Sequence, residues 1–340
     1  MFEASATESL DTYGDKYTMV CNHAQWLGLG LIVLAVAQAI PTKYYQEFSP
    51  LIYFVGLIGL IAVLIPNFGV TVNGATRWLA IGSFRFQPAE LMKLGIVLFF
   101  PRWLIQHQRP GAFLLTTLLP LILVMMQPDL GSTLIIATLA FGLYALTERD
   151  LRTIGGFLLG GMALITLLII VSPYRRERIR TFINPDHDNT GESYHIQQIT
   201  LALGNGGLMG VGPGQSMQKY RYIPELSTDS IFALIAEEFG FIGSLLVIAL
   251  MIWLIQTSFA ITMTQKPDSY SFLLSAGISL WLAAQTILNL AAIVSLVPLT
   301  GIPLPLISRG GTSLVVLLFL IGVLLSIGEK EKLLRNLSKK

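Results

Sequence analysis

Residues 222–243 read YIPELSTDSIFALIAEEFGFIG, and they place Asp229 directly before a long apolar run that contains Glu237 and Glu238. An apolar run of about 20 residues can cross a membrane as a helix. A carboxylate inside such a helix is costly unless it faces protein or a polar cavity. The stretch therefore predicts a membrane helix that starts beside an acid and turns at least one glutamate toward protein.

The composition of the whole chain agrees with a membrane protein. Hydrophobic residues make up 53%, charged residues only 12%, and the mean hydropathy is +0.67, which excludes an ordinary soluble domain. The length and continuity of the apolar runs exclude a β-barrel. We expect an all-α polytopic bundle, one membrane domain over residues 1–340, with about nine spans near 25–40, 49–66, 89–106, 112–127, 131–147, 154–172, 231–258, 272–296 and 312–329.

Lys and Arg in the short loops predict the orientation, because cytoplasmic loops carry an excess of them. The basic tail, residues 329–340, is then cytoplasmic, and the long segment 173–228 is a large extracellular loop. Nine spans would put the N-terminus outside, yet residues 1–24 contain no signal peptide. Either one span is miscounted or a helix is missing before Met1.

Several classes of site are excluded. Cys21 is the one cysteine, so the chain can form no intramolecular disulfide or cysteine-based metal cluster. The four histidines have no metal-ligand spacing, and the net charge of +2 is dispersed, with no nucleic-acid signature.

Two polar segments interrupt the apolar pattern. NGATRWLAIGSFRFQPAELMKLG, residues 73–95, has a Gly-rich turn and then a helix start with Glu90 and Lys93 on one face. MMQPDLGST, residues 125–133, contains Asp129. Both segments have an alternative interpretation: Glu90 and Lys93 as a self-neutralising pair, and Asp129 as a cap of the next helix.

The segment 173–228 is too long for a simple connection, and long ordered loops usually carry function. Its centre is rich in glycine, which permits close backbone approach or re-entrant structure. Its arginines could hold an anionic head group, although contact with lipid phosphates is the better interpretation for Arg175, Arg176, Arg178 and Arg180.

Four blocks of the chain resemble the SEDS (shape, elongation, division and sporulation) family of the FtsW and RodA type, in the family's order and over nearly the whole length. They are NGATRWLAIG with QPAELMKL, then QPDLGST, then GESYHIQQITLALGNGGLMGVGPGQSMQKYRYIPELSTDSIFALIAEEFGFIG, and finally QTILNLAAIVSLVPLTGIPLPLISRGGTS. The resemblance implies a ten-helix fold and a glycosyltransferase that polymerises lipid II at the outer face of the bacterial plasma membrane. GQSMQKYRYIPE is closer to the division members.

The chain departs from the family pattern at several places. The resemblance implies a first membrane helix of which this sequence matches only the end, and we expect this to account for the orientation problem. STDSIFA stands where HTDFIFA is usual, QPAE for QPSE and SRGGTS for SYGGSS, so Ser230 and Arg309 are departures. Arg309 adds a cation near the expected site.

The resemblance assigns Asp229 as the catalytic residue. A β-1,4 bond formed from an α-linked pyrophosphate donor inverts the anomeric carbon, so one displacement needs a base and cations but no nucleophilic residue. We expect Asp229 to be the base for the 4-hydroxyl; from the residues alone, an N-cap beside Ser227 and Thr228 is the stronger interpretation. The expected substrate-binding residues are Arg77, Glu90, Lys93, Gln127, Asp129, Gln198, Lys219, Glu225, Thr228, Ser308, Arg309 and Gly310.

Glu237 and Glu238 are expected about 12 Å deeper on the same helix at 1.5 Å per residue. Structural pairing with a cation across the bundle, at Lys93, Arg77 or Arg309, is favoured over catalysis. A divalent cation, Mg or Mn, would suit the pyrophosphate oxygens, although no spacing proves a metal site. The expected partners are a class B penicillin-binding transpeptidase and other divisome or elongasome membrane proteins, since the chain has no Ser-x-x-Lys transpeptidase pattern.

Two other classes remain open. A lipid II flippase or transporter would also be a helical bundle, and residues 298–311 could be an interrupted helix, but the two halves show no internal repeat. A noncatalytic cell-wall scaffold would explain the membrane spans but not the polar segments. The polar segments gather on one side of the membrane, which favours chemistry there.

Overall fold

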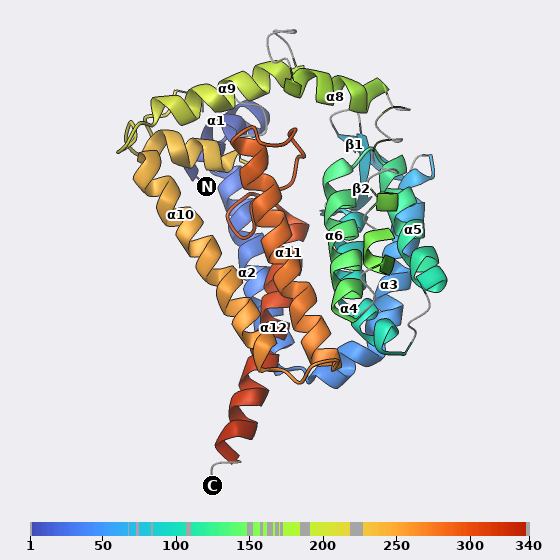
Figure 1. Ribbon diagram of the computed structural model, residues 1–340. Coiled ribbons are helices and arrows are strands. Elements are labelled where there is room, and N and C mark those ends of the chain that lie inside the picture. Colours follow the sequence, from blue (N-terminus) through green and yellow to red (C-terminus); the bar gives the residue numbers. More distant parts are fainter. Residues whose placement is uncertain are drawn as a thin grey trace. The chain divides into compact units, whose positions relative to one another are not determined.

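The computed structural model describes residues 2–66, 68–72, 75–82, 84–106, 110–147, 152–156, 159–161, 166, 170, 173–183, 191–217 and 227–337. Helices dominate the fold (Figure 1). Before the sheet they are α1 (Phe2–Tyr13), α2 (Thr18–Ala39) and α3 (Thr42–Leu64). The later helices are α4 (Pro88–Gln106), α5 (Pro110–Met126), α6 (Leu130–Thr147), α8 (Pro173–Ile183), α9 (Gly191–Asn205), α10 (Ile231–Thr264), α11 (Tyr270–Ile293) and α12 (Gly311–Leu337).

Six of the described helices are long and apolar enough to cross a membrane: Thr18–Ala39, Thr42–Leu64, Leu130–Thr147, Ile231–Met263, Tyr270–Ile293 and Gly311–Lys330. Helices α4 and α5 also match predicted spans. However, α5 has 17 residues, and α4 carries three charged side chains, at Glu90, Lys93 and Arg102. The predicted span 154–172 lies largely outside the described residues. The polytopic helical architecture is confirmed.

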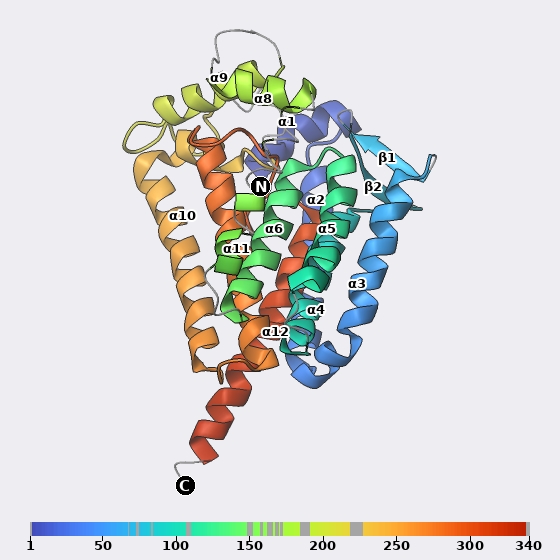
Figure 2. The same cartoon turned by 45° about the vertical axis from the view of Figure 1, so that its right-hand side comes forward.

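A small antiparallel sheet was not predicted. Its strands are β1 (Gly69–Val72), β2 (Ala75–Ile81) and β3 (Phe84–Phe86), in the order β1-β2-β3. Val70 pairs with Trp78, and Leu79 pairs with both Gly69 and Phe86. The sheet lies at the end of α3 (Figure 2). Residues 75–81 and 84–86 of the segment in which we predicted a Gly-rich turn are thus strands, and Trp78 belongs to the central strand.

The chain forms two compact units. The first holds Met1–Gln25, Gly156–Leu254 and Gln285–Gly310, and the second holds Trp26–Gly155, Ile255–Ala284 and Gly311–Lys340. Segments 173–183 and 191–205 of the predicted extracellular loop are helices α8 and α9, which run end to end across the top of Figure 1.

The core of the first unit joins α9 to the start of α10 and to the end of α11. Ile199, Phe232 and Ile293 are each at most 3% exposed, and they pack in one cluster with Leu299 and Leu304 of the α11–α12 loop. Burial of such side chains contributes about 1.5–3 kcal/mol each. This packing fixes α9 against the start of α10.

In the second unit α3 and α4 approach closely at two glycines. A β-carbon on Gly56 would lie 3.1 Å from Met92 Cα, and one on Gly95 would lie 2.9 Å from Tyr53 Cα. Small residues permit such close packing of membrane helices, whose association depends on van der Waals contact. The packing holds the start of α4, with Glu90 and Lys93, in place.

Candidate active site

Asp229 lies in a turn, residues 227–229, and is half-buried. Ser230 follows it directly, before α10, and the Ser230 carbonyl accepts the Ala233 N–H at 3.0 Å. Ser230 Oγ also donates to Asp229 Oδ1 at 3.3 Å. The residue that begins the hydrogen bonding of α10 is thus Ser230, one position after the predicted base.

Asn289 of α11 holds the backbone on both sides of this site. Its Nδ2 donates to the Asp229 carbonyl at 2.8 Å and to the Ile302 carbonyl at 2.7 Å. The orientation of the amide follows from these contacts, because the exchanged orientation would place oxygen against two carbonyl oxygens. One turn earlier, Gln285 Nε2 donates to the Pro303 carbonyl at 2.9 Å. Two amides on one face of α11 therefore satisfy an irregular loop whose carbonyls would otherwise lack partners.

The α11–α12 loop passes directly beside the Asp229 carboxylate. Gly301 has φ +68°, and a β-carbon on it would lie 3.9 Å from Asp229 Oδ2. Thr300 is 7% exposed, and its Oγ1 has no hydrogen-bond partner among the residues that the structure describes. The segment that could have been an interrupted transporter helix is a loop between α11 and α12, and it forms one wall of the Asp229 site.

Arg309 lies in the same loop, and Glu8 of α1 neutralises it. Arg309 Nη1 is 3.5 Å from Glu8 Oε1, and Glu8 Oε2 accepts the Ser227 hydroxyl at 3.0 Å. The Arg309 N–H donates to the Ser227 carbonyl at 2.8 Å. The predicted extra cation is therefore present near Asp229, but it serves to tie the turn 227–229 to α1. Ser308 is buried, and its hydroxyl accepts the Leu304 N–H at 2.8 Å, so it supports the loop.

The prediction for Glu237 and Glu238 needs correction, because α10 breaks at Gly240 (φ 66°, ψ −164°). Its first residues run in a different direction from the rest, beneath α9 (Figure 1). The Glu237 carboxylate accepts a hydrogen bond from Ser216. Glu237 is thus paired with the loop that follows α9, residues 206–217, called the glycine-rich loop below. Of the cations predicted to pair with it, Lys93 pairs with Glu90 and Arg309 pairs with Glu8.

The glycine-rich loop supplies the hydrogen bonds that the break removes from α10. Four backbone bonds of 2.9–3.2 Å join them: Val211 and Gly212 donate to Glu237 and Glu238, and Phe241 and Ile242 donate to Gly207 and Leu208. Such pairing makes non-helical backbone tolerable at the end of a membrane helix.

His195 of α9 was considered in the sequence only as a metal ligand, and the structure places it beside the site. Its Nε2 lies 2.9 Å from Ser230 Oγ. Burial, with a smaller contribution from Arg178, lowers the His195 pKa from 6.5 to about 4. Asn289 was missed too, although an Asn and a Gln four residues apart in an apolar run were a usable signal.

Other predicted residues gather in the second unit, around the start of α6. Arg77 Nε donates to the Gln127 carbonyl at 3.2 Å, and the Arg77 guanidinium also bonds the Pro128 carbonyl. Asp129 Oδ1 accepts the Ser132 N–H at 2.9 Å, which is an N-cap, and its Oδ2 accepts Gln87 Nε2 at 2.9 Å. The capping interpretation of Asp129 is confirmed.

Glu90 and Lys93 form a buried ion pair on α4. Lys93 Nζ is 2.6 Å from Glu90 Oε1 and 5.1 Å from the ring centroid of Trp281, and both charged side chains are at most 4% exposed. The pair neutralises itself, as one interpretation predicted, and the cation–π contact adds to its stability. Glu90 Oε2 is buried, and within the described part of the chain it has no hydrogen-bond partner.

The remaining predicted residues are less informative. Gln198 lies on α9 one turn after His195, Thr228 lies beside Asp229, and Gly310 directly precedes α12. Lys219 and Glu225 lie outside the described residues. No three His, Cys, Asp or Glu side chains gather closely enough to hold a metal ion in the part of the chain that the structure describes.

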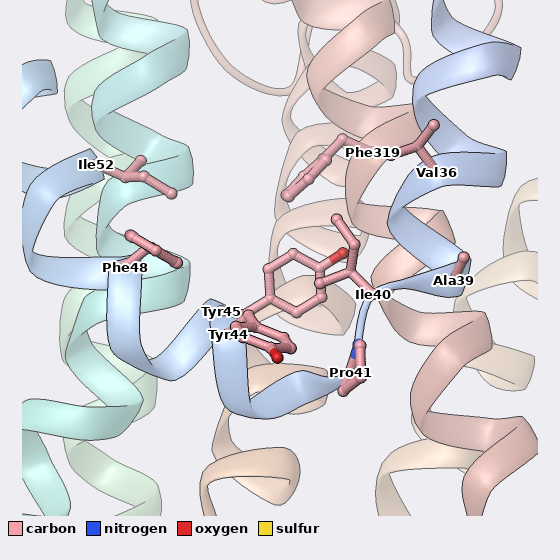
Figure 3. Close-up of a pocket in the computed structure, with 9 residues that line it drawn as sticks. All are labelled: Val36, Ala39, Ile40, Pro41, Tyr44, Tyr45, Phe48, Ile52 and Phe319. Atoms are coloured by element: carbon pink, nitrogen blue, oxygen red, sulfur yellow. The ribbon is translucent and has the colours of Figure 1, made fainter.

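Two cavities in the second unit differ in character. One of about 400 Å³ lies between the sheet and the ends of α3 and α5, and Thr71, Thr76 and Gln127 are in its lining. A larger apolar groove of about 590 Å³ lies between α2 and α3 (Figure 3). Its lining has Tyr44 and Tyr45 but no acid or base, so its size does not make it the site of proton transfer.

Solved structures share the fold over nearly the whole chain. One described as "Structural coordination of polymerization and crosslinking by a peptidoglycan synthase complex" has a TM-score of 0.77 at 26% identity, covering 97% of this chain and 95% of the other. The rod shape determining protein RodA of Thermus thermophilus has a TM-score of 0.69 at 26% identity, covering 97% and 94%. By its fold, the chain belongs to the class of SEDS-type polytopic membrane proteins.

Sequence relatives place the chain in one family. The model for FtsW, RodA and SpoVE, described as cell cycle protein, matches residues 1–333. The "Probable peptidoglycan glycosyltransferase FtsW" of Francisella salina is 35% identical over 98% of this chain and 85% of its own length. Stage V sporulation protein E of Bacillus subtilis is 32% identical, covering 98% and 93%. The chain belongs to the FtsW/RodA/SpoVE family, and it is a peptidoglycan glycosyltransferase that polymerises glycan strands in cell division or cell-shape determination.

Proposed function

We propose that the chain polymerises lipid II with Asp229 as the general base. The observation that carries the proposal is the environment of this carboxylate. Asn289 fixes its backbone, Ser230 bonds Oδ1, and the loop at Gly301 passes beside Oδ2. A half-buried carboxylate whose backbone and side chain are both held in place is suited to accept a proton from a bound hydroxyl.

In the proposed step the 4-hydroxyl oxygen of the acceptor sugar attacks the anomeric carbon of the donor. The new C–O bond forms as the bond from that carbon to the pyrophosphate oxygen breaks. Asp229 takes the hydroxyl proton, and undecaprenyl pyrophosphate leaves with the electron pair. A single displacement inverts the α-linked donor to the β-linked product, so no covalent enzyme intermediate is needed.

The leaving pyrophosphate needs positive charge. We propose a divalent cation, Mg or Mn, bound mainly through phosphate oxygens and water, as is usual for Mg²⁺ with phosphate substrates. The described residues offer no cluster of three acidic or imidazole ligands, so the protein would supply few of the ligands itself.

We further propose that the Asp229 turn faces the outer side of the plasma membrane, with the basic C-terminal tail in the cytoplasm, as the Lys and Arg distribution predicts. A class B penicillin-binding transpeptidase would crosslink the product. Support comes from the structural relative described as coordinating polymerization and crosslinking in a peptidoglycan synthase complex.

The test is glycan polymerisation from purified lipid II in detergent, with the transpeptidase partner present. Asp229→Ala and Asp229→Asn should lower the rate by about 10²- to 10⁴-fold, the usual contribution of a general base. Asp268→Asn is the matched control, because Asp268 is an exposed acid in the α10–α11 loop.

Full activity in folded Asp229→Asn would refute the assignment of the base. If the parent chain made no glycan but moved lipid II across vesicle membranes in an Asp229-dependent way, the transporter would replace the polymerase.

A further inference from the structure

Ser230 Oγ lies between two groups that come from different elements. It is 3.3 Å from Asp229 Oδ1 on one side and 2.9 Å from His195 Nε2 on the other. His195 is on α9, whereas Ser230 directly precedes α10. The three side chains thus form a continuous hydrogen-bonded chain from α9 to the proposed base.

The position of His195 is well determined by packing. Its neighbours Ile196 and Ile199 are 9% and 1% exposed, and they contact Ile231 and Phe232 in the core of the first unit. Because α9 and the start of α10 share this core, the imidazole is held in register with Ser230.

The direction of the hydrogen bonds follows from the single hydroxyl hydrogen of Ser230. An ionised carboxylate only accepts, so the hydroxyl donates to Asp229 Oδ1. Ser230 Oγ must then accept from His195, which requires hydrogen on Nε2. Both the neutral Nε2–H tautomer and the imidazolium satisfy this requirement, so the chain persists whichever form His195 takes.

The consequence for Asp229 is that its carboxylate is held through Oδ1. Ser230 donates to Oδ1, and the backbone of Gly301 passes beside Oδ2. A partial rotation of the carboxylate away from this arrangement would break the bond to Ser230. The bond therefore limits the rotation of the carboxylate.

We infer that Ser230 and His195 are positioning residues that hold the Asp229 carboxylate, through Oδ1, in the orientation in which it accepts the proton of the acceptor hydroxyl. The inference rests on the proposed function of Asp229. Neither side chain takes or gives the transferred proton, and neither touches substrate. The chain acts on the orientation of the base, which is a contribution to the catalytic step and not to substrate binding.

The experiment measures kcat and KM for lipid II polymerisation in four variants of the full chain. Ser230→Ala removes the bridging hydroxyl, and Ser230→Thr keeps it. His195→Phe removes the donor, and His195→Gln keeps an N–H near the position of Nε2. We expect Ser230→Ala and His195→Phe to lower kcat by roughly ten- to hundredfold with little change in KM, since misplaced catalytic groups have effects of this size.

Rescue separates positioning from simple structural support. Ser230→Thr and His195→Gln should recover most of kcat, and the double variant Ser230→Ala/His195→Phe should be no slower than the slower single variant, because both act through one oxygen. Ser244→Ala is the matched control: this buried serine of α10 donates to the Gly240 carbonyl of its own helix, at 2.9 Å.

The measurements distinguish a failure of this inference from a failure of the proposed function. Folded Ser230→Ala with parental kcat, while Asp229→Asn is inactive, would overturn this inference alone. Equal losses in Ser230→Thr and Ser230→Ala, or purely multiplicative losses in the double variant, would also overturn it. Full activity in Asp229→Asn would remove the proposed base and this inference together.

Discussion

At the residue scale, the Asp229 site depends on groups that belong to distant parts of the chain. Asn289 contacts two carbonyls, one before α10 and one in the α11–α12 loop. Glu8 and Arg309 tie the same turn to α1. These contacts explain how a carboxylate in a short turn keeps a defined position at the end of a membrane helix.

Asn289→Ala should therefore lower both stability and activity. Loss of the amide leaves two carbonyl groups without their donor, which costs about 1–3 kcal/mol in free energy of unfolding. The measurement is thermal unfolding in detergent together with the initial rate of polymerisation. Gln285→Ala is the control, since the hydrogen bond of Gln285 to the Pro303 carbonyl does not reach the Asp229 turn, and its loss should affect the rate less. Equal rates for both variants would contradict the role of Asn289 at Asp229.

His195 should make stability depend on pH. Its pKa is about 4 in the folded protein and 6.5 when unperturbed, because burial disfavours the imidazolium. Between these values the unfolded chain binds a proton that the folded chain does not. The contribution is therefore complete above pH 6.5 and is lost as the pH falls toward 4. Midpoints of thermal unfolding from pH 7.5 to 4.5 should fall less steeply in His195→Gln than in the parent; parallel curves would contradict this prediction.

At the scale of elements, the break in α10 and the glycine-rich loop form one unit of structure. A β-carbon on Gly240 would lie 2.3 Å from Gly210 N, and one on Gly210 would lie 2.1 Å from the Glu238 carbonyl oxygen. Gly240 also has φ and ψ values that are essentially restricted to glycine. The two segments can meet only because neither carries a side chain at the crossing.

Gly240→Ala should be strongly destabilising, by about 3 kcal/mol or more, from backbone strain and the clash with Gly210 together. Size-exclusion profiles and unfolding midpoints in detergent would report the loss. Gly204→Ala is the matched control, because Gly204 lies in α9 with open space at its β-carbon position. Alanine there should be neutral or slightly stabilising through its higher helix propensity. A monodisperse Gly240→Ala protein with the parental midpoint would contradict the crossing.

At the scale of the whole molecule, the orientation in the membrane can be tested by cysteine labelling. Cys21 is exposed, so it would first be replaced by serine. Met209 lies in the glycine-rich loop and is 78% exposed. The variant Met209→Cys should therefore react with a membrane-impermeant maleimide added outside cells. Lys266→Cys, in the exposed α10–α11 loop, should react only after permeabilisation. Labelling of Lys266→Cys in intact cells would reverse the proposed orientation.

The family and much of the fold follow from the sequence alone. Hydropathy predicts the membrane helices to within a few residues at many of their ends, because the bilayer requires long apolar runs with satisfied backbones. The requirement for apolar runs also drew attention to Glu90, Lys93 and Asp229, because their charged side chains break the apolar pattern. The helix N-cap at Asp129 and the ion pair on α4 were both among the local interpretations, since they depend on residues three apart.

Only the tertiary structure decided the contacts between segments far apart in the chain. The break at Gly240 depends on hydrogen bonds from residues 207–212, and the Asp229 site depends on His195, Asn289 and Gly301. None of these pairings leaves a periodic signal, because a hydrogen bond between distant residues is set by how helices pack. The small sheet was missed for the same reason, since a strand of three to seven residues becomes stable only when its partners are beside it. The sequence alone thus determined the membrane fold and the family and drew attention to Asp229, whereas packing determined which side chains surround that acid.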